Sequence, residues 1–205
     1  MTERENVFLV DDNNAVRHAL SLFLESRNFR VRDYSSAEEL LTDIETHDSG
    51  VVVLDMCMKD MSGLELQAEL KTRGITLPII FITGHGNVQD SVQALKQGAA
   101  DFIEKPFDNE LLLESIKRAL HEERSQRNQR AARQELAVKY KRLTPREREV
   151  MKYIVHGTSN KSLAELLGVS SRTIEVHRSR IMSKMGAGSL PELVCMAITL
   201  GIISS

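Results

Sequence analysis

Short apolar runs alternate with helical patterns over residues 6–120. The runs VVVL (51–54) and PIIFI (78–82) are apolar at every position, which is typical of strands buried on both faces of a sheet. The segments between the runs are long enough to hold helices, and such connections join parallel strands. The pattern therefore predicts an α/β unit with a helix-covered parallel sheet. The predicted strands are 7–10, 30–34, 51–54, 78–83 and 101–104, and the predicted helices are 14–27, 37–47, 63–73, 88–97 and 108–121.

Residues 142–205 contain helical patterns only. Thr144, Pro145 and Glu147 have the order of an N-cap, a first-turn proline and an N3 acid. The next two helices are joined by a tight turn at Gly168, which is typical of a helix-turn-helix unit. The predicted helices cover 144–156, 160–167 and 171–185, and a fourth opens at Ser189. The residues expected to hold the pair together are Leu163, Leu166, Leu167, Val169, Ile174 and Ile181.

Residues 121–141 are rich in charge, contain no Gly or Pro, and have a weak apolar stripe. Glu123 and Arg127 have the i,i+4 spacing that supports a helix. This segment is interpreted as a polar helical linker, either separate from the fifth helix or continuing it, and a disordered tether is the alternative.

Charge divides the chain in two. Residues 1–135 hold 16 Lys and Arg against 24 Asp and Glu, a net charge of −8, whereas residues 136–205 hold 11 against 5, a net charge of +6. A basic module of this size is a candidate nucleic-acid binder. No apolar stretch is long enough for a membrane span, and the N-terminus lacks a signal-peptide core, so a cytoplasmic protein without a membrane partner is expected. Two cysteines do not make a disulfide framework.

Polar side chains that suit phosphate chemistry follow four of the predicted strands. Asp11 and Asp12 follow the first strand, Asp55 the third, Thr83 ends the fourth, and Lys105 follows the fifth. Because parallel strands bring their carboxyl ends to one edge of a sheet, we expect a single site. Three neighbouring carboxylates need a cation, and oxygen ligands suit Mg²⁺ (or Mn²⁺). Asp55 is the expected phosphoryl acceptor, Lys105 a neutralising charge, and Thr83 a hydrogen-bond donor to the group.

A rival class is a Mg²⁺-dependent phosphatase with an aspartyl nucleophile. Such an enzyme needs a general acid to protonate the leaving group. The haloacid-dehalogenase type has an Asp two residues after the nucleophile, and this chain has Cys57 there. The rival also leaves residues 142–205 without a role, so an enzyme is not expected beyond slow self-dephosphorylation.

The strand-end residues resemble the receiver domain of two-component response regulators. MSGLELQ (61–67), FITGHGNV (81–88) and GAADFIEKPF (98–107) are similar to the FixJ subgroup. The resemblance implies a flavodoxin-like fold with strand order 2-1-3-4-5, and phosphorylation of Asp55 by a partner sensor histidine kinase. It further implies a cis bond before Pro106. The implied metal ligands are Asp11 or Asp12, Asp55 and the backbone carbonyl of Cys57, and the implied switch residues are Thr83 and Phe102.

Three positions depart from the pattern of this family. Asn13 stands where a third acid is often found, and the loop after Asp55 reads Cys57-Met58-Lys59 where Arg-Met-Pro is common. Loss of the proline is expected to loosen the loop and change phosphorylation or dephosphorylation rates. A vestigial receiver on a phosphorylation-independent DNA binder is therefore a third alternative.

The basic module resembles the four-helix DNA-binding domain of the LuxR/NarL/FixJ class. The similarity lies in LTPREREVM (143–151), GTSNKSLAELLGVSSRTIEVHRSRIMSKM (157–185) and AGSLPELV (187–194). It suggests base contacts from Glu175, Val176 and Ser179 in the major groove. The full set expected at the DNA is Asn160, Lys161, Arg172, Thr173, Glu175, Val176, His177, Arg178, Ser179, Arg180 and Lys184.

The sequence thus predicts a phosphorylation-controlled transcription factor. Its expected parts are a receiver (1–120), a charged helical linker (121–141) and a helix-turn-helix domain (142–205). Expected partners are promoter DNA, RNA polymerase, and a second copy of the chain after phosphorylation, since dimers suit paired half-sites.

Overall fold

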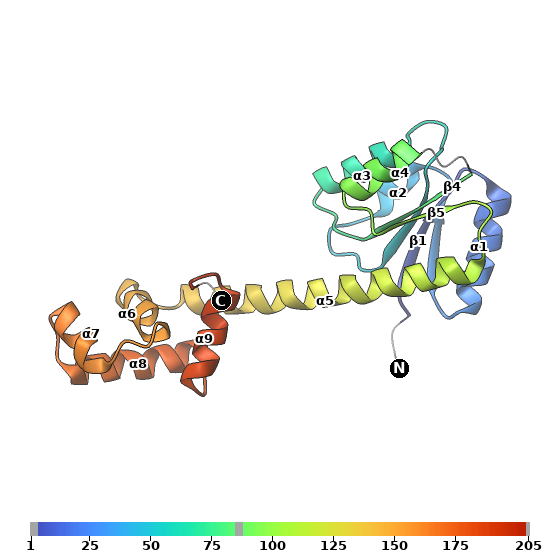
Figure 1. The fold of residues 1–205 in the computed structure, drawn as a ribbon. Coiled ribbons are helices and arrows are strands. Elements are labelled where there is room, and N and C mark those ends of the chain that lie inside the picture. Colours follow the sequence, from blue (N-terminus) through green and yellow to red (C-terminus); the bar gives the residue numbers. More distant parts are fainter. Residues whose placement is uncertain (1–3, 85–87, 204–205) are drawn as a thin grey trace. The chain divides into compact units, whose positions relative to one another are not determined.

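The computed structural model describes residues 4–84 and 88–203 (Figure 1). The chain divides into two compact units between Gln126 and Arg127. The first unit holds a five-stranded parallel sheet in the order β2-β1-β3-β4-β5, which confirms the predicted fold class and strand order. Its elements are β1 (Asn6–Val10), α1 (Asn14–Ser26), β2 (Arg30–Tyr34), α2 (Ala37–Asp43), β3 (Val51–Asp55), α3 (Gly63–Thr72), β4 (Ile79–Thr83), α4 (Val88–Lys96), β5 (Asp101–Glu104) and α5 (Asn109–Lys141).

Alternating side chains of the central strands build a separate core on each face of the sheet. Val7 and Leu9 of β1 belong to the core that contains residues of α1 and α5. Phe8 and Val10 of the same strand belong to the core that contains residues of α2, α3 and α4. Figure 1 shows these two helical layers on opposite sides of the sheet. Because helices cover both faces of the sheet, residues on both sides of a central strand are buried. Such a strand can be apolar at every position.

Helix α2 ends at Asp43, and its predicted extension to 47 is wrong. Ile44 is already extended, with φ −82° and ψ 137°. The Asp48 carboxylate accepts a hydrogen bond from the backbone N–H of Glu45 at 2.8 Å. An Asp side chain that binds nearby backbone N–H groups competes with helix formation, which explains the early end.

Helix α5 runs without a break from Asn109 to Lys141. Its first turns bury Leu112, Leu113 and Ile116 against the sheet, whereas most residues beyond Leu120 are polar and exposed. Residues 121–141 are thus helical and continue the fifth helix, rather than forming a disordered tether. Among the described helices, α5 included, none is long and apolar enough to cross a membrane.

The second unit contains α6 (Pro145–Val155), α7 (Asn160–Leu167), α8 (Ser171–Met185) and α9 (Leu190–Thr199), which confirms the predicted helix-turn-helix domain. Helix α7 ends at Gly168, whose φ of 65° is left-handed and costs glycine little. The Ser170 hydroxyl then caps α8 by accepting from the Thr173 N–H at 3.1 Å. One packing prediction is wrong, because Leu166 is 59% exposed. Leu163 is fully buried, so the inward face of α7 leaves Leu166 at its edge.

An ion pair joins the start of α6 to the end of α8. Thr144 and Glu147 form the predicted capping box. Lys184 Nζ lies 2.6 Å from Glu147 Oε2, and Glu147 is only 2% exposed. Burial alone would raise the pKa of the Glu147 carboxyl, but hydrogen bonds from Lys184 and Thr144 outweigh it and lower the pKa below its usual value. The ionised carboxylate therefore stabilises the second unit.

Replacing Glu147 by Gln is expected to destabilise the second unit by about 1–3 kcal/mol at pH 7, because a charge-assisted hydrogen bond is lost. In the unchanged protein this stabilisation is fully present above the usual carboxyl pKa of 4.5 and is lost as pH falls through the lowered folded value. The variant should lack that loss. Amide hydrogen exchange of α6 and α8 at pH 7 and pH 4 measures both effects. Glu149→Gln, at an exposed position of α6, is the control. An equal loss in the two variants would contradict the role of Glu147.

Candidate functional site

Five polar side chains gather at the carboxyl edge of the sheet. Asp11, Asp12 and Asp55 offer carboxylate oxygens that lie within 4.8 Å of one another. Lys105 Nζ lies 2.9 Å from Asp11 Oδ2 and 2.9 Å from Asp55 Oδ2. Thr83 is the last residue of β4, which pairs with β3 and β5. The strand topology thus brings together side chains up to 94 positions apart, as the strand-end pattern predicts.

Backbone hydrogen bonds orient the carboxylates. Asp11 is fully buried, and its Oδ1 accepts from the Asn13 N–H at 2.8 Å. Asp55 Oδ1 accepts from the Cys57 N–H at 3.1 Å. In each case the other oxygen, Oδ2, remains for Lys105. Asn13, where a third acid is often found, caps α1 instead: its Oδ1 accepts from the Ala15 N–H at 3.0 Å.

Lys105 supplies positive charge at the centre of the site. Burial by itself lowers the pKa of its ammonium group, but hydrogen bonds to Asp11 and Asp55 outweigh burial and raise the pKa above its usual value. The ammonium therefore stays charged at neutral pH. The three carboxylates outnumber the two lysines that pair with them in the described structure, Lys105 with Asp11 and Asp55, and Lys59 with Asp12.

The donor set fits a hard divalent cation. The three clustered groups are carboxylates, and oxygen ligands of this kind suit Mg²⁺ or Mn²⁺ better than zinc. Asp11 is fully buried and Asp55 is 8% exposed, whereas Asp12 is half-buried and open to water. Such a site leaves coordination positions open for water, and Mg²⁺ usually keeps several bound waters in proteins.

The predicted switch residues lie on neighbouring strands. Thr83 is 1% exposed, and Phe102 is half-buried against the core formed with α2, α3 and α4. The peptide bond between Lys105 and Pro106 is cis, as the resemblance implies. The exposed Cys57 thiol lies 4.0 Å from the Thr83 hydroxyl. The sequence gives no sign of this contact, because the two residues are 26 positions apart.

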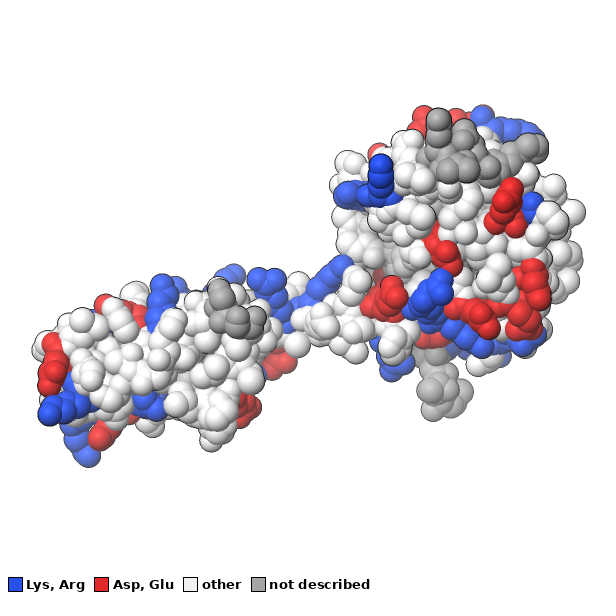
Figure 2. Space-filling model, viewed as in Figure 1, with Lys and Arg blue, Asp and Glu red and all other residues white. Residues whose placement is uncertain are grey.

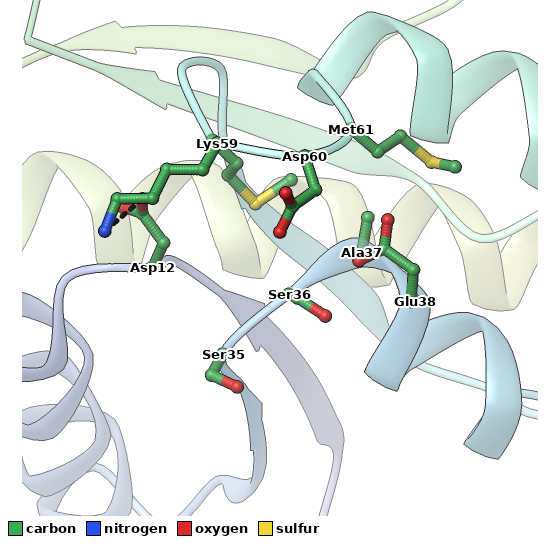
Figure 3. A pocket seen from close by; sticks show the side chains of 9 residues that line it. Asp12, Ser35, Ser36, Ala37, Glu38, Lys59, Asp60 and Met61 are labelled. Carbon is green, nitrogen blue, oxygen red and sulfur yellow. Dashed lines mark ion pairs between the residues drawn. The ribbon is translucent and has the colours of Figure 1, made fainter.

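A cavity of about 270 Å³ opens beside Asp12 (Figure 3). It lies between the loops that follow β1, β2 and β3. Lys59 extends over it toward Asp12, with Nζ 3.9 Å from Asp12 Oδ2. The sequence singles out Lys59 as a departure from proline but gives no sign of this ion pair. The lining of the cavity consists of Asp12, Ser35, Ser36, Ala37, Glu38, Met58, Lys59, Asp60 and Met61.

The residues expected at the DNA lie mainly on α8. Figure 2 shows basic side chains spread over the second unit, in keeping with its net charge of +6 over 136–205. The exposed members of the set are Lys161, Arg172, Glu175, Val176, Ser179 and Arg180, and the half-buried members are Asn160, Thr173, His177, Arg178 and Lys184. The side of α8 that packs into the core carries Ile174, Ile181 and Met185.

Two members of this set, Lys184 and His177, are half-buried in the second unit. Lys184 pairs with the buried Glu147, so it has a structural role whether or not it also contacts phosphate. His177 Nδ1 is buried and has no hydrogen-bond partner among the described residues.

Known proteins share both units. The response regulator receiver domain matches residues 7–117. The luxR family of bacterial regulatory proteins matches residues 141–197. The chain belongs to the response regulators. Within this family it combines a receiver domain with a LuxR-type DNA-binding domain, as FixJ-like regulators do.

Relatives of this response regulator match it over nearly its whole length. FixJ of Azorhizobium caulinodans is 43% identical over 98% of this chain and 96% of its own. TodT of Pseudomonas putida is 42% identical over 95% of this chain and 86% of its own. The solved structure of the response regulator StyR is 37% identical, with a TM-score of 0.86 over 95% of this chain and 98% of its own. Full-length FixJ from B. japonicum is also 37% identical, with a TM-score of 0.61 over 99% of this chain and all of its own.

Proposed function

We propose that Asp55 of this response regulator accepts a phosphoryl group from a sensor histidine kinase, and that the aspartyl phosphate controls binding to promoter DNA. The observation that carries the proposal is the geometry around Asp55, whose Oδ2 lies 2.9 Å from Lys105 Nζ beside two further carboxylates. A carboxylate oxygen attacks phosphorus as the P–N bond of the donor phosphohistidine breaks. Lys105 then neutralises charge on the phosphoryl oxygens, and the Thr83 hydroxyl donates a hydrogen bond to one of them.

Mg²⁺ (or Mn²⁺) is the proposed cofactor. Asp11, Asp12, Asp55 and the backbone carbonyl of Cys57 would hold it. When bound, it would offset the negative charge of the carboxylates and of the incoming phosphoryl group. The chain's own residues orient the acceptor, because the Cys57 N–H fixes Asp55 Oδ1.

Thr83 and Phe102 are proposed to carry the conformational change from the phosphorylated site to the surface of the receiver. Movement of Thr83 toward the phosphoryl group would empty space beside Phe102 and change the face formed by α4 and β5. Part of the segment expected to move, residues 85–87, lies outside the described residues. β5 is joined to α5, because Asp101 Oδ2 accepts hydrogen bonds from Ser115 Oγ and Arg118 Nη2, both at 2.6 Å. The changed face would support a homodimer or release the DNA-binding domain.

The second unit is proposed to read promoter DNA in the cytoplasm. Helix α8 would enter the major groove, where Glu175, Val176 and Ser179 would meet base edges and Arg172 would contact phosphate. RNA polymerase is the proposed downstream partner of the DNA-bound dimer.

A phosphatase is less well supported than a phosphorylation switch. The position two residues after Asp55 is Cys57, whose thiol lies against Thr83 and is no substitute for a carboxylic acid. At most, slow self-dephosphorylation is expected. Turnover of a phosphomonoester substrate would support the phosphatase instead.

The test compares the full-length protein with and without beryllofluoride and Mg²⁺. Beryllofluoride mimics the phosphoryl group on Asp55, so it should double the mass in solution and increase promoter affinity. Light scattering and footprinting on neighbouring genomic promoters measure the two effects, and fluoride with Mg²⁺ alone is the control. Equal promoter affinity under all conditions would favour a vestigial receiver.

A further inference from the structure

Lys59 has no part in the proposed phosphoryl transfer, yet its charge lies beside the acidic site. The cavity next to Asp12 is lined by three acids, Asp12, Glu38 and Asp60, and by Lys59 as the cation among its lining residues. Figure 3 shows the Lys59 side chain reaching from the loop after β3 to the opposite loop that carries Asp12. Its own side chain is 84% exposed, so packing does not force this direction.

The position of this ion pair matters more than its strength. An exposed pair with a separation of 3.9 Å adds little to stability. Asp12, however, is one of the three clustered carboxylates. An ammonium group against Asp12 reduces the pull of that carboxylate on a metal ion, and it repels a dication twice as strongly as a single charge. Lys105 already pairs with the other two carboxylates, Asp11 and Asp55.

We propose that Lys59 lowers the affinity of the acidic site for Mg²⁺ by holding positive charge against Asp12. The inference rests on the proposed function, since it assigns Lys59 a regulatory role at that same site. The site then fills with metal, and becomes ready for phosphoryl transfer, only at higher Mg²⁺ concentration. Lys59 is a positioning residue, because its charge acts through Asp12. It does not touch the phosphoryl donor.

The test measures metal binding directly, without phosphorylation. Full-length protein is titrated with Mn²⁺ at low salt, free Mn²⁺ is followed by electron paramagnetic resonance, and Mg²⁺ competition gives the second constant. Lys59→Met should lower both dissociation constants about threefold to tenfold. Lys59→Arg keeps the charge and should match the parent. Lys71→Met, an exposed lysine in the last turn of α3, is the control and should also match the parent. High salt should shrink the effect, because the charge is exposed.

Equal dissociation constants for the parent and Lys59→Met would overturn the inference. So would tightening by Lys59→Arg as large as that by Lys59→Met, because loop mobility and not charge would then be the cause. Circular dichroism checks the fold, and Lys59→Gln replaces the Met variant if that protein does not fold. Unchanged constants together with normal labelling of Asp55 would overturn the role of Lys59 alone, whereas no Mn²⁺ binding by any of the proteins would overturn the metal site as well.

Discussion

Replacing Asp55 by Asn is expected to abolish labelling by acetyl phosphate in the presence of Mg²⁺. An amide has no anionic oxygen to attack phosphorus, so the loss should be complete rather than partial. The fold should survive, because an Asn side chain retains an oxygen that can accept from the Cys57 N–H, now at 3.1 Å from Asp55 Oδ1. Lys105 keeps its other partner, Asp11, at 2.9 Å.

Asp60→Asn is the matched control for this experiment. Asp60 is an exposed carboxylate in the same loop and lines the neighbouring cavity, but it does not belong to the metal-binding cluster. Its variant should be labelled like the parent. Normal labelling of Asp55→Asn would show that the phosphoryl group goes elsewhere, and the assignment of the site would then be wrong.

Replacing Lys105 by Met is expected to destabilise the first unit by roughly 3 kcal/mol in the absence of divalent cations. Asp11 is fully buried and Asp55 is 8% exposed, and removing their shared ammonium leaves two carboxylates without a close positive partner. Breaking one partner of a buried ion pair costs about this much, because the remaining charge is neither solvated nor paired. Urea unfolding followed by amide signals of the sheet measures the loss.

Millimolar Mg²⁺ should restore more stability to Lys105→Met than to the parent. A dication binds the folded site and supplies the missing positive charge, so it shifts the folding equilibrium by mass action. Lys105→Arg keeps a charge and should lose much less stability. Lys117→Met, at an exposed position of α5, should change stability little. A Met variant as stable as the parent without metal would mean that Lys105 does not hold the two carboxylates in place.

Local patterns were enough to predict most of the helix ends. The capping box at Thr144 and Glu147 and the glycine end of α7 at Gly168 depend on residues within a few positions of one another, so their energetics are local. The end of α2 was not predictable in this way, because the Asp48 carboxylate competes for the backbone at Glu45. The burial of Leu166 was wrongly predicted, because a regular apolar pattern does not indicate which edge of a helix the neighbouring helices cover.

The order of residues along the chain is enough to predict the parallel sheet, the three carboxylates, hydroxyl and ammonium at its carboxyl edge, and the basic helix-turn-helix unit. It could do so because strand direction and side-chain alternation are periodic properties, and parallel strands place their ends together. The contacts of Lys59 with Asp12, of Cys57 with Thr83, and of Glu147 with Lys184 are visible only in the folded chain. Those contacts depend on how loops and helix ends from distant parts of the chain approach in space, and no local periodicity records that approach.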